Sequence, residues 1–286
     1  MHSVKLIKAI STTAVYLIFI TVLIIVLFPI IYVILSAFKS NMEIMAHPEW
    51  YFPRNFTFEN FAIAWNSDSF NVGRMFFNSL WYTTFTVIIT LATSSVSGYV
   101  FARGEFKLKK FFFTLFSALM FISLGSITIY PKFEILSLIG LNKSLWGLII
   151  LQCFGIPVVN MYLVRSFVNT LPYELDEAAI IDGCTFTGIF FKIIFPLLKP
   201  VLATLAILSF QSSWNSYLMP TLFTMSRPDQ QTLIVGIIAL KNSGEGAAAW
   251  NLMFAATTIA LLPILVVYAI FSRFFTEGIT AGAVKG

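Results

Sequence analysis

Long apolar runs alternate with short polar segments along this chain, and this pattern is typical of a helical membrane protein. Each run holds about 20 residues, enough for an α-helix to cross a hydrocarbon core of about 30 Å. The residue-by-residue alternation of a membrane β-barrel is missing, so helices are favoured over strands. Six spans are predicted, at about 13–38, 76–102, 111–130, 145–164, 197–219 and 252–271.

Composition supports the same fold class. The chain has 286 residues, of which 58% are hydrophobic and only 11% are charged, whereas soluble domains average about 25% charged residues. We therefore expect an all-α integral membrane protein with a single transmembrane domain over residues 1–286. The first apolar run is long and lacks a small-residue cleavage site, so it is interpreted as a retained span rather than a signal peptide.

The positions of the basic residues predict the topology. Six spans place both termini on one side of the membrane, and 11 of the 18 Lys and Arg residues lie on that side, in the termini and in the segments 103–110 and 165–199. The positive-inside rule therefore predicts that both termini are cytoplasmic and that the chain is a multi-pass membrane protein. Since topology accounts for the net charge of +5, nucleic acid is not needed as a partner.

Residue types that carry chemistry are few and scattered, so no catalytic set and no metal site are expected. His2 and His47 are far apart and on opposite sides of the predicted membrane, and Cys153 lies in a span while Cys184 lies in a loop. A membrane enzyme would need a cluster of such residues near one face. An ion-coupled secondary transporter is also disfavoured, because every Asp and Glu falls in a loop or near a span end.

Polar residues gather in the fifth predicted span, where they are costly unless they face a helix bundle or a wet cavity. Sugars suit such a surface, since amides bond their hydroxyls and aromatic rings stack on their apolar faces. The alternative is ordinary hydrogen bonding between helices. The absence of Lys or Arg from the interior of any span mildly disfavours a charged solute. The candidate residues of a solute pathway are Asn78, Gln211, Trp214 and Asn215, with Asn160 as a possible addition.

The polar segment 169–196, between the fourth and fifth spans, predicts a helical hairpin on the cytoplasmic side. Pro172 suits the first turn of a helix, because its missing donor would be unpaired there. Acidic residues follow near the positive end of the helix dipole. They are Glu174, Asp176 and Glu177.

The end of this helix and the start of the next are also predicted. Gly183 can supply the left-handed residue that ends the first helix, and a second short helix is expected at 185–195 before Pro196 leads back into the membrane. Ala178 and Ala179 have little side-chain bulk and would let a partner approach closely. Spacing alone leaves a generic amphipathic surface helix as the alternative.

A resemblance favours the more specific interpretation. The run Glu177-Ala178-Ala179-Ile-Ile-Asp182-Gly183, followed after nine residues by Ile193-Ile-Phe-Pro196, resembles the EAA loop of ABC-importer permeases. The family usually has Leu where this chain has Phe195. Other features are similar to the maltose-type second permease subunit of the carbohydrate branch: Pro200, Trp214-Asn215, Asn78-Ser79 and the C-terminal segment 278–286.

The resemblance implies a mechanism and partners. The chain would be a non-catalytic permease subunit in a bacterial cell membrane, importing a carbohydrate, with an oligosaccharide favoured and a polyol phosphate or other small solute as the alternative. Its partners would be a second homologous permease, two copies of a P-loop ATPase and an extracytoplasmic substrate-binding protein. The chain has no Gly-x-x-x-x-Gly-Lys-Ser/Thr motif, so ATP and Mg²⁺ would be bound by the partner and no cofactor by this chain.

The resemblance also assigns roles to particular residues. The ATPase would contact Glu177, Ala178, Ala179, Asp182 and Gly183 of the EAA loop, with Glu177 as the polar anchor. The tail 273–286 would be cytoplasmic, and its residues Gly282, Lys285 and Gly286 would contact the ATPases, with a disordered end as the alternative. The aromatic outer segment 39–74, in which Pro48 and Pro53 break any helix, fits an interfacial aromatic belt or a docking surface for the binding protein.

Overall fold

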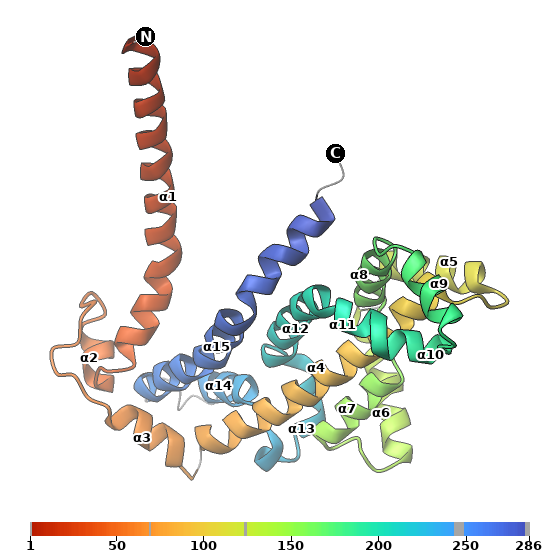
Figure 1. Cartoon of the computed structure of the whole chain (residues 1–286). Helices are drawn as coiled ribbons and strands as arrows, with labels where there is room; N and C mark the ends of the chain where they lie inside the picture. The colour runs from red at the N-terminus through yellow and green to blue at the C-terminus, as the bar shows by residue number, and fades with distance from the viewer. Residues whose placement is uncertain (1, 69, 123–124, 243–248, 284–286) are drawn as a thin grey trace. The chain divides into compact units, whose positions relative to one another are not determined.

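The computed structural model describes residues 2–68, 70–122, 125–242 and 249–283, with side chains described between residues 12 and 272 of these ranges. Within them the chain is helical and contains no β-strand, which confirms the all-α expectation (Figure 1). The chain divides into two compact units, Met1–Gly73 with Ile237–Leu261, and Arg74–Gly236 with Leu262–Gly286. The single transmembrane domain over 1–286 stays a prediction.

The first unit contains α1 (His2–Ser36), α2 (Asn41–Ala46), α3 (Glu59–Asn66) and the N-terminal part of α15 (Trp250–Ala283). Apolar side chains of α1 are exposed from Val15 to Ile31. A helix that is apolar on all sides and unburied needs a lipid environment. The described part of α1 is therefore suited to lie in a bilayer.

The segment 39–74 contains two helices, α2 and α3, which lie on either side of Pro48 and Pro53, so no helix runs through either proline. Asn60 is buried there, and its side-chain amide donates to the backbone oxygens of Ala37 and Lys39, at 2.8 Å each. These bonds satisfy carbonyls beyond the end of α1 that have no partner within the helix. The segment is thereby fixed to α1.

The second unit contains the remaining helices. They are α4 (Val72–Arg103), α5 (Lys109–Phe121), η1 (Gly125–Thr128), α6 (Ile129–Leu138), α7 (Leu145–Cys153), α8 (Val158–Val168), α9 (Glu174–Ile181), α10 (Phe186–Ile189), η2 (Phe190–Ile194), α11 (Phe195–Leu197), α12 (Lys199–Trp214), α13 (Leu218–Thr224), η3 (Pro228–Gln230) and α14 (Leu233–Asn242). Three helices cross the division between the units: α4 begins at Val72, α14 ends at Asn242, and α15 passes from the first unit to the second after Leu261.

Three described helices are long and apolar enough to cross a membrane, at Thr12–Ser36, Val72–Arg103 and Trp250–Ser272. Two bent pairs, Leu145–Cys153 with Val158–Val168 and Phe186–Leu197 with Lys199–Trp214, raise the number to five if each pair is one span. The predicted first, second and sixth spans therefore correspond to continuous helices. Six spans in total stay a prediction.

The three other predicted spans are interrupted, and backbone chemistry explains each interruption. Span 111–130 is not one helix, because α5 ends at Phe121 and Gly125 has a left-handed φ of +50°. Span 145–164 bends by 41° between α7 and α8, where Pro157 lacks a donor and disfavours helical geometry at the residue before it. Span 197–219 ends at Trp214, since Pro220 would collide with the carbonyl of Ser216 in a continued helix.

Helices α4 and α8 pack closely enough to act as one support. A Cβ added at Gly98 of α4 would lie 2.6 Å from the side chain of Val164 in α8, so a larger residue here would force the helices apart. Arg165 reaches back from α8, and its Nε donates to the backbone oxygen of Phe101 at 3.3 Å. The C-terminal end of α4 is thus held beside α8.

Candidate functional site

The segment that follows α8 forms the helical hairpin that the sequence predicts. Its first helix, α9, begins at Glu174, two residues later than expected, and ends where predicted, because Gly183 has φ +79°. The amide of Gly183 donates to the oxygen of Ile180 at 3.0 Å, and the amide of Cys184 donates to that of Ala179 at 2.9 Å. This bond pair is the Schellman ending of a helix, which requires a left-handed residue.

Replacing Gly183 by Ala is expected to destabilise the protein by about 1 kcal/mol, because a left-handed conformation costs a residue with a Cβ that amount. No steric penalty adds to it, since no heavy atom lies within 4 Å of the added Cβ. Thermal unfolding in detergent should show the loss. Gly155→Ala is the matched control, because Gly155 lacks a positive φ and its nearest neighbour is 3.6 Å away. Equal losses in the two variants would contradict the assignment.

The second arm of the hairpin runs as a helix from Phe186 to Leu197, close to the predicted 185–195. Thr185 caps its start, with its hydroxyl oxygen accepting from the amide of Gly188 at 3.2 Å. Residues Phe190–Ile194 form a π-helical turn. The chain then bends by 74° into α12, beside Pro200, which cannot donate the hydrogen bond that would continue the helix.

An apolar cluster fixes the hairpin to the helices beneath it. Its buried members come from α4, α8, α9, the second arm and α12. They are Tyr99, Val164, Val168, Ala179, Ile189, Phe190, Ile194, Leu198 and Leu205. The ring of Tyr99 stacks on Phe186 with centroids 4.6 Å apart, and its hydroxyl donates to the oxygen of Phe186 at 3.2 Å. Close packing of this kind transmits displacement with little compliance, so the hairpin and these helices should move together.

A buried ion pair adds a polar connection that sequence reasoning missed. Nε of Arg103, at the end of α4, lies 3.0 Å from Oδ2 of Asp176 in α9, with both side chains buried. The guanidinium also donates to the oxygen of Leu171 at 2.8 Å and lies over the ring of Tyr173. The sequence interpretation placed Arg103 in a topology-setting turn and Asp176 at a helix dipole. One feature of the sequence could have indicated that Asp176 faces inward. Asp176 and Ala179 are three residues apart, so they lie on the same face of α9.

The opposite face of the hairpin is open. Glu177 and Asp182 are exposed, and the carboxylate of Glu177 has no hydrogen-bond or ion-pair partner within the described part of the chain. Two large apolar side chains accompany them, since Ile180 is 58% and Ile181 is 85% exposed. Figure 1 shows α9 and α10 next to the end of α8. Charged and apolar groups side by side on a fixed support are suited to protein docking.

The two alanines of the EAA run have different environments. Ala178 is exposed, whereas Ala179 is only 4% exposed and belongs to the apolar cluster. The small size of Ala179 therefore lets α9 approach the chain's own core. Contact of the ATPase with Ala179, as with Ala178, Glu177, Asp182 and Gly183, stays a prediction.

The four predicted residues of the solute pathway line none of the three cavities described below. Trp214 is 1% exposed and stacks on Phe210 and against Phe76, so it is a core residue. The amide of Asn78 donates to the backbone oxygens of Asp229 and Gln231, at 2.8 and 3.0 Å, and holds a loop. Asn215 donates to the oxygen of Gln211 within its own segment, at 3.0 Å. Pathway roles for Trp214 and Asn78 are therefore not supported, and those of Gln211 and Asn215 stay predictions.

Two polar cavities lie beside these residues instead. One of about 300 Å³ is lined by side chains of α4, α6, α7, α12 and the segment after it, including Tyr82, Lys132 and Gln152. The other, of about 220 Å³, includes Thr86, Thr90 and Asn160. Gln152, Ser212 and Ser213 line both cavities. The sequence named Asn160 as an addition to the pathway and noted the serines, but it missed Gln152 and Lys132.

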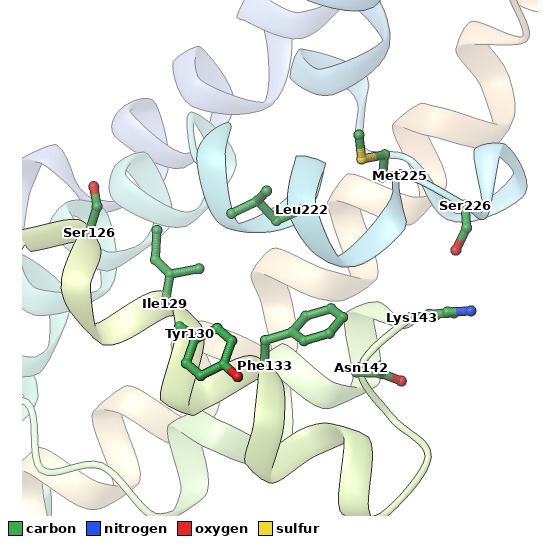
Figure 2. Close-up of a pocket in the computed structure, with 9 residues that line it drawn as sticks. All are labelled: Ser126, Ile129, Tyr130, Phe133, Asn142, Lys143, Leu222, Met225 and Ser226. Atoms are coloured by element: carbon green, nitrogen blue, oxygen red, sulfur yellow. The ribbon is translucent and has the colours of Figure 1, made fainter.

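A larger and mainly apolar cavity of about 650 Å³ lies between α6, α13 and the loop after α6. Figure 2 shows Tyr130 and Phe133 of α6 on the same side of the opening as Ile129. Leu222 of α13 and Met225, directly after that helix, lie across from them, and Lys143 lies at the far edge. Its lining is mainly apolar, whereas the two other cavities have polar linings. In the apolar cavity Lys143 lies next to an apolar surface, while in the cavity of about 300 Å³ Lys132 lies among hydroxyls and an amide.

The C-terminal segment 273–286, expected as a cytoplasmic tail that contacts the ATPases, is helical over most of its length, and its contacts stay a prediction. Helix α15 continues to Ala283, so Gly282 lies in its last turn. Lys285 and Gly286 lie outside the described residues. Within the described part of the chain, no group of three or more His, Cys, Asp or Glu side chains could hold a metal ion.

Comparison with known proteins identifies the family. A family model described as the inner membrane component of binding-protein-dependent transport systems matches residues 94–280, which include the whole hairpin. The probable ABC transporter permease protein YurM of Bacillus subtilis is 31% identical, with 97% of this chain and 90% of that protein covered. The arabinooligosaccharides transport system permease protein AraQ of Halalkalibacterium halodurans is 33% identical, with 92% of each chain covered.

A solved structure shares the fold. The crystal structure of a bacterial ABC transporter involved in the import of the acidic polysaccharide alginate contains a chain that superposes with a TM-score of 0.77 at 22% identity, covering 94% of this chain and 96% of that one. With the family model and the curated relatives, this shows that the chain belongs to the family of inner membrane components of binding-protein-dependent transport systems, the permease subunits of ABC transporters.

Proposed function

We propose that this permease forms half of the translocation pathway of an ATP-driven carbohydrate importer and is driven through the hairpin 169–196. The main observation that supports this proposal is that one side of the hairpin is packed against the chain while the other side is exposed. Its buried side is fixed to α4, α8 and α12 by the apolar cluster and by the Arg103–Asp176 pair. Its open side presents Glu177 and Ile181 to a partner.

The cargo class rests on the relatives. Curated permeases similar to this chain are named for arabinooligosaccharides and for melibiose, raffinose and stachyose, the latter in Bacillus subtilis at 34% identity over 83% of this chain. The polar cavities support the same class, because hydroxyl, amide and ammonium groups line them. Oligosaccharides are bound through groups of these kinds. We infer a carbohydrate substrate, with an oligosaccharide as the preferred form.

The partners follow from what the chain supplies and lacks. Permeases of this family work in transporter complexes with other subunits. We infer a second homologous permease, two copies of a P-loop ATPase and an extracytoplasmic binding protein. The sequence has no P-loop motif, and the open face of α9 has the mixed apolar and charged character of a docking surface. ATP and Mg²⁺ are assigned to the ATPase, which alone catalyses hydrolysis.

The mechanism is rigid-body switching. Closure of the ATPase dimer would pull its two docked hairpins together, and since each hairpin moves with its spans, the pathway would change from inward- to outward-facing. The hairpin is then cytoplasmic, as are both termini, in agreement with the distribution of Lys and Arg. Gly282 in the last turn of α15 and the residues that follow it are assigned a further contact with the ATPases.

Partner identification tests this function. The tagged chain is purified from its host in mild detergent, and stoichiometric partners are identified by mass spectrometry. We expect a second permease with an EAA loop and a P-loop ATPase, and a binding protein encoded with them, whose sugar ligands can then be screened. Recovery of the chain alone, or as a homo-oligomer without an ATPase in several detergents, contradicts the proposal.

A further inference from the structure

The polar cavity of about 300 Å³ has an unusual combination of groups in its lining. Lys132 reaches it from α6, Gln152 from α7, and Ser212 and Ser213 from α12. No Asp or Glu is among the described residues that line this cavity or its neighbour. The cavity therefore contains a cation and hydrogen-bonding groups without a carboxylate to neutralise the charge.

The hydroxyls near these cavities differ in whether they have a partner in their own helix. In α4, Thr93, Ser94 and Ser97 donate to backbone oxygens of their own helix, at 2.5 to 2.8 Å. The side chains of Ser212 and Ser213 make no such bond within the described part of the chain, and neither does that of Gln152. Polar groups in a membrane protein are costly when unsatisfied. Gln152 and Ser212 are exposed and Ser213 is half-buried, so these three side chains are open to water or to a solute.

Lys132 is the exception among the half-buried and buried lysines of the described chain. Nζ of Lys109 donates to the oxygen of Gly104 at 2.8 Å, and that of Lys39 donates to the oxygen of Trp50. Lys132 has neither an ion pair nor a hydrogen bond within the described residues, although it is only partly exposed. A partly desolvated cation without a partner favours an anion beside it.

We propose that this cavity binds a polyhydroxylated solute that carries an anionic group, with Lys132 as the counter-ion and Gln152, Ser212 and Ser213 as hydrogen-bonding partners of its hydroxyls. The inference rests on the proposed transport function and specifies its cargo. A volume near 300 Å³ lies at the lower end of small-molecule sites, so the cavity holds one small solute or one residue of a longer chain. The anionic group can be a carboxylate or a phosphate.

This inference reverses an expectation from the sequence. The lack of Lys or Arg inside the predicted spans disfavoured a charged solute, because Lys132 was assigned to an outer loop after residue 130. The break after α5 instead starts α6 at Ile129, and this helix places Lys132 in the lining of the cavity. The hydrophobic pattern did not reveal the break between α5 and α6. This break therefore changes the predicted charge of the cargo.

Direct binding tests the proposal on the whole transporter. The purified complex, free of binding protein, is placed in nanodiscs, both nucleotide-free and trapped with vanadate. Binding of digalacturonate is compared with that of galactobiose, its neutral counterpart, by saturation-transfer NMR, and glucose 6-phosphate with glucose. We expect at least one anionic probe to bind about tenfold or more tightly than its neutral counterpart, since a hydrogen bond to a charged group is worth that factor or more. The probe that shows the preference identifies carboxylate or phosphate as the anionic group.

Variants locate the preference. Lys132→Gln should abolish the preference for the anion and leave neutral binding within about twofold, whereas Lys132→Arg should retain most of it. Lys143→Gln is the matched control, because Lys143 lies at the edge of the apolar cavity. An unchanged preference in Lys132→Gln, a loss in Lys143→Gln alone, or no anion preference at probe concentrations up to about 10 mM would each overturn the inference.

Failure of this inference differs from failure of the proposed function. If a complex with an ATPase is recovered and takes up sugar, but Lys132→Gln has no effect on anion binding, only the cargo assignment is wrong. If no ATPase accompanies the chain, the transport function itself is wrong.

Discussion

Asp176→Ala is expected to destabilise the protein by about 3 to 5 kcal/mol, because it leaves the buried guanidinium of Arg103 without its counter-charge. Nε of Arg103 lies 3.0 Å from the Asp176 carboxylate, and neither side chain has free access to water. Loss of the pair should also loosen α9 from the end of α4, so uptake should fall with stability. Unfolding in detergent and uptake in proteoliposomes measure the two effects.

A double-mutant cycle separates the pair from its surroundings. The double variant Arg103→Leu with Asp176→Leu should lose less stability than either single change, since exchanging a buried pair for apolar residues is often neutral. Part of the loss should remain, because the oxygen of Leu171 loses the bond from Arg103. Asp182→Ala is the control, as Asp182 is exposed at the end of the same helix. Additive losses in the double variant would show that the two residues do not interact.

Glu177→Arg is expected to abolish transport while the complex stays folded. Glu177 is exposed and has no partner within the described chain, so reversing its charge costs little internally. It should instead weaken docking of the ATPase by at least about tenfold, since truncating one partner of an interfacial charge pair costs 2 to 5 kcal/mol. Uptake and co-purification of the ATPase are measured together. Gly183→Asp is expected to give the same loss of transport.

The control for Glu177→Arg is Glu105→Arg, which makes the same charge change at another exposed position, in the loop after α4. It should leave uptake within about twofold. Normal uptake by Glu177→Arg would remove this residue from the coupling mechanism. Equal losses in both variants would point to a general effect of charge on membrane insertion.

Local chemistry explains why the hairpin was predictable. Pro172, the acidic first turn and Gly183 are signals that act within a few residues, and the left-handed φ of Gly183 is where the sequence placed it. The three uninterrupted spans could also be predicted from the sequence, because hydropathy over about 20 residues depends on no distant contact. The breaks within the other three spans could not be predicted from hydropathy, since it does not register the Gly and Pro residues that interrupt a helix.

Long-range pairing accounts for the rest. Arg103 and Asp176 are far apart in sequence, and no periodicity shows that the end of α4 meets the inner face of α9. Trp214 was predicted as a pathway residue because it lies within a polar run, but only the packed structure places it against Phe76 and Phe210. Lys132 lines a cavity because α6 begins before it, at Ile129. Contacts of this kind depend on tertiary packing, which a pattern along one chain does not specify.

Cross-linking from the hairpin tests the central claim most directly. A photoreactive p-benzoylphenylalanine replaces Ile181, which is 85% exposed, or, as a control, Phe154, which is 86% exposed at the bend between α7 and α8. The account predicts that position 181 forms a covalent adduct with the P-loop ATPase in native membranes and that position 154 does not. Adducts of position 181 with lipid or another protein only, in a transporter that still imports its solute, would contradict the claim that the hairpin is the coupling site.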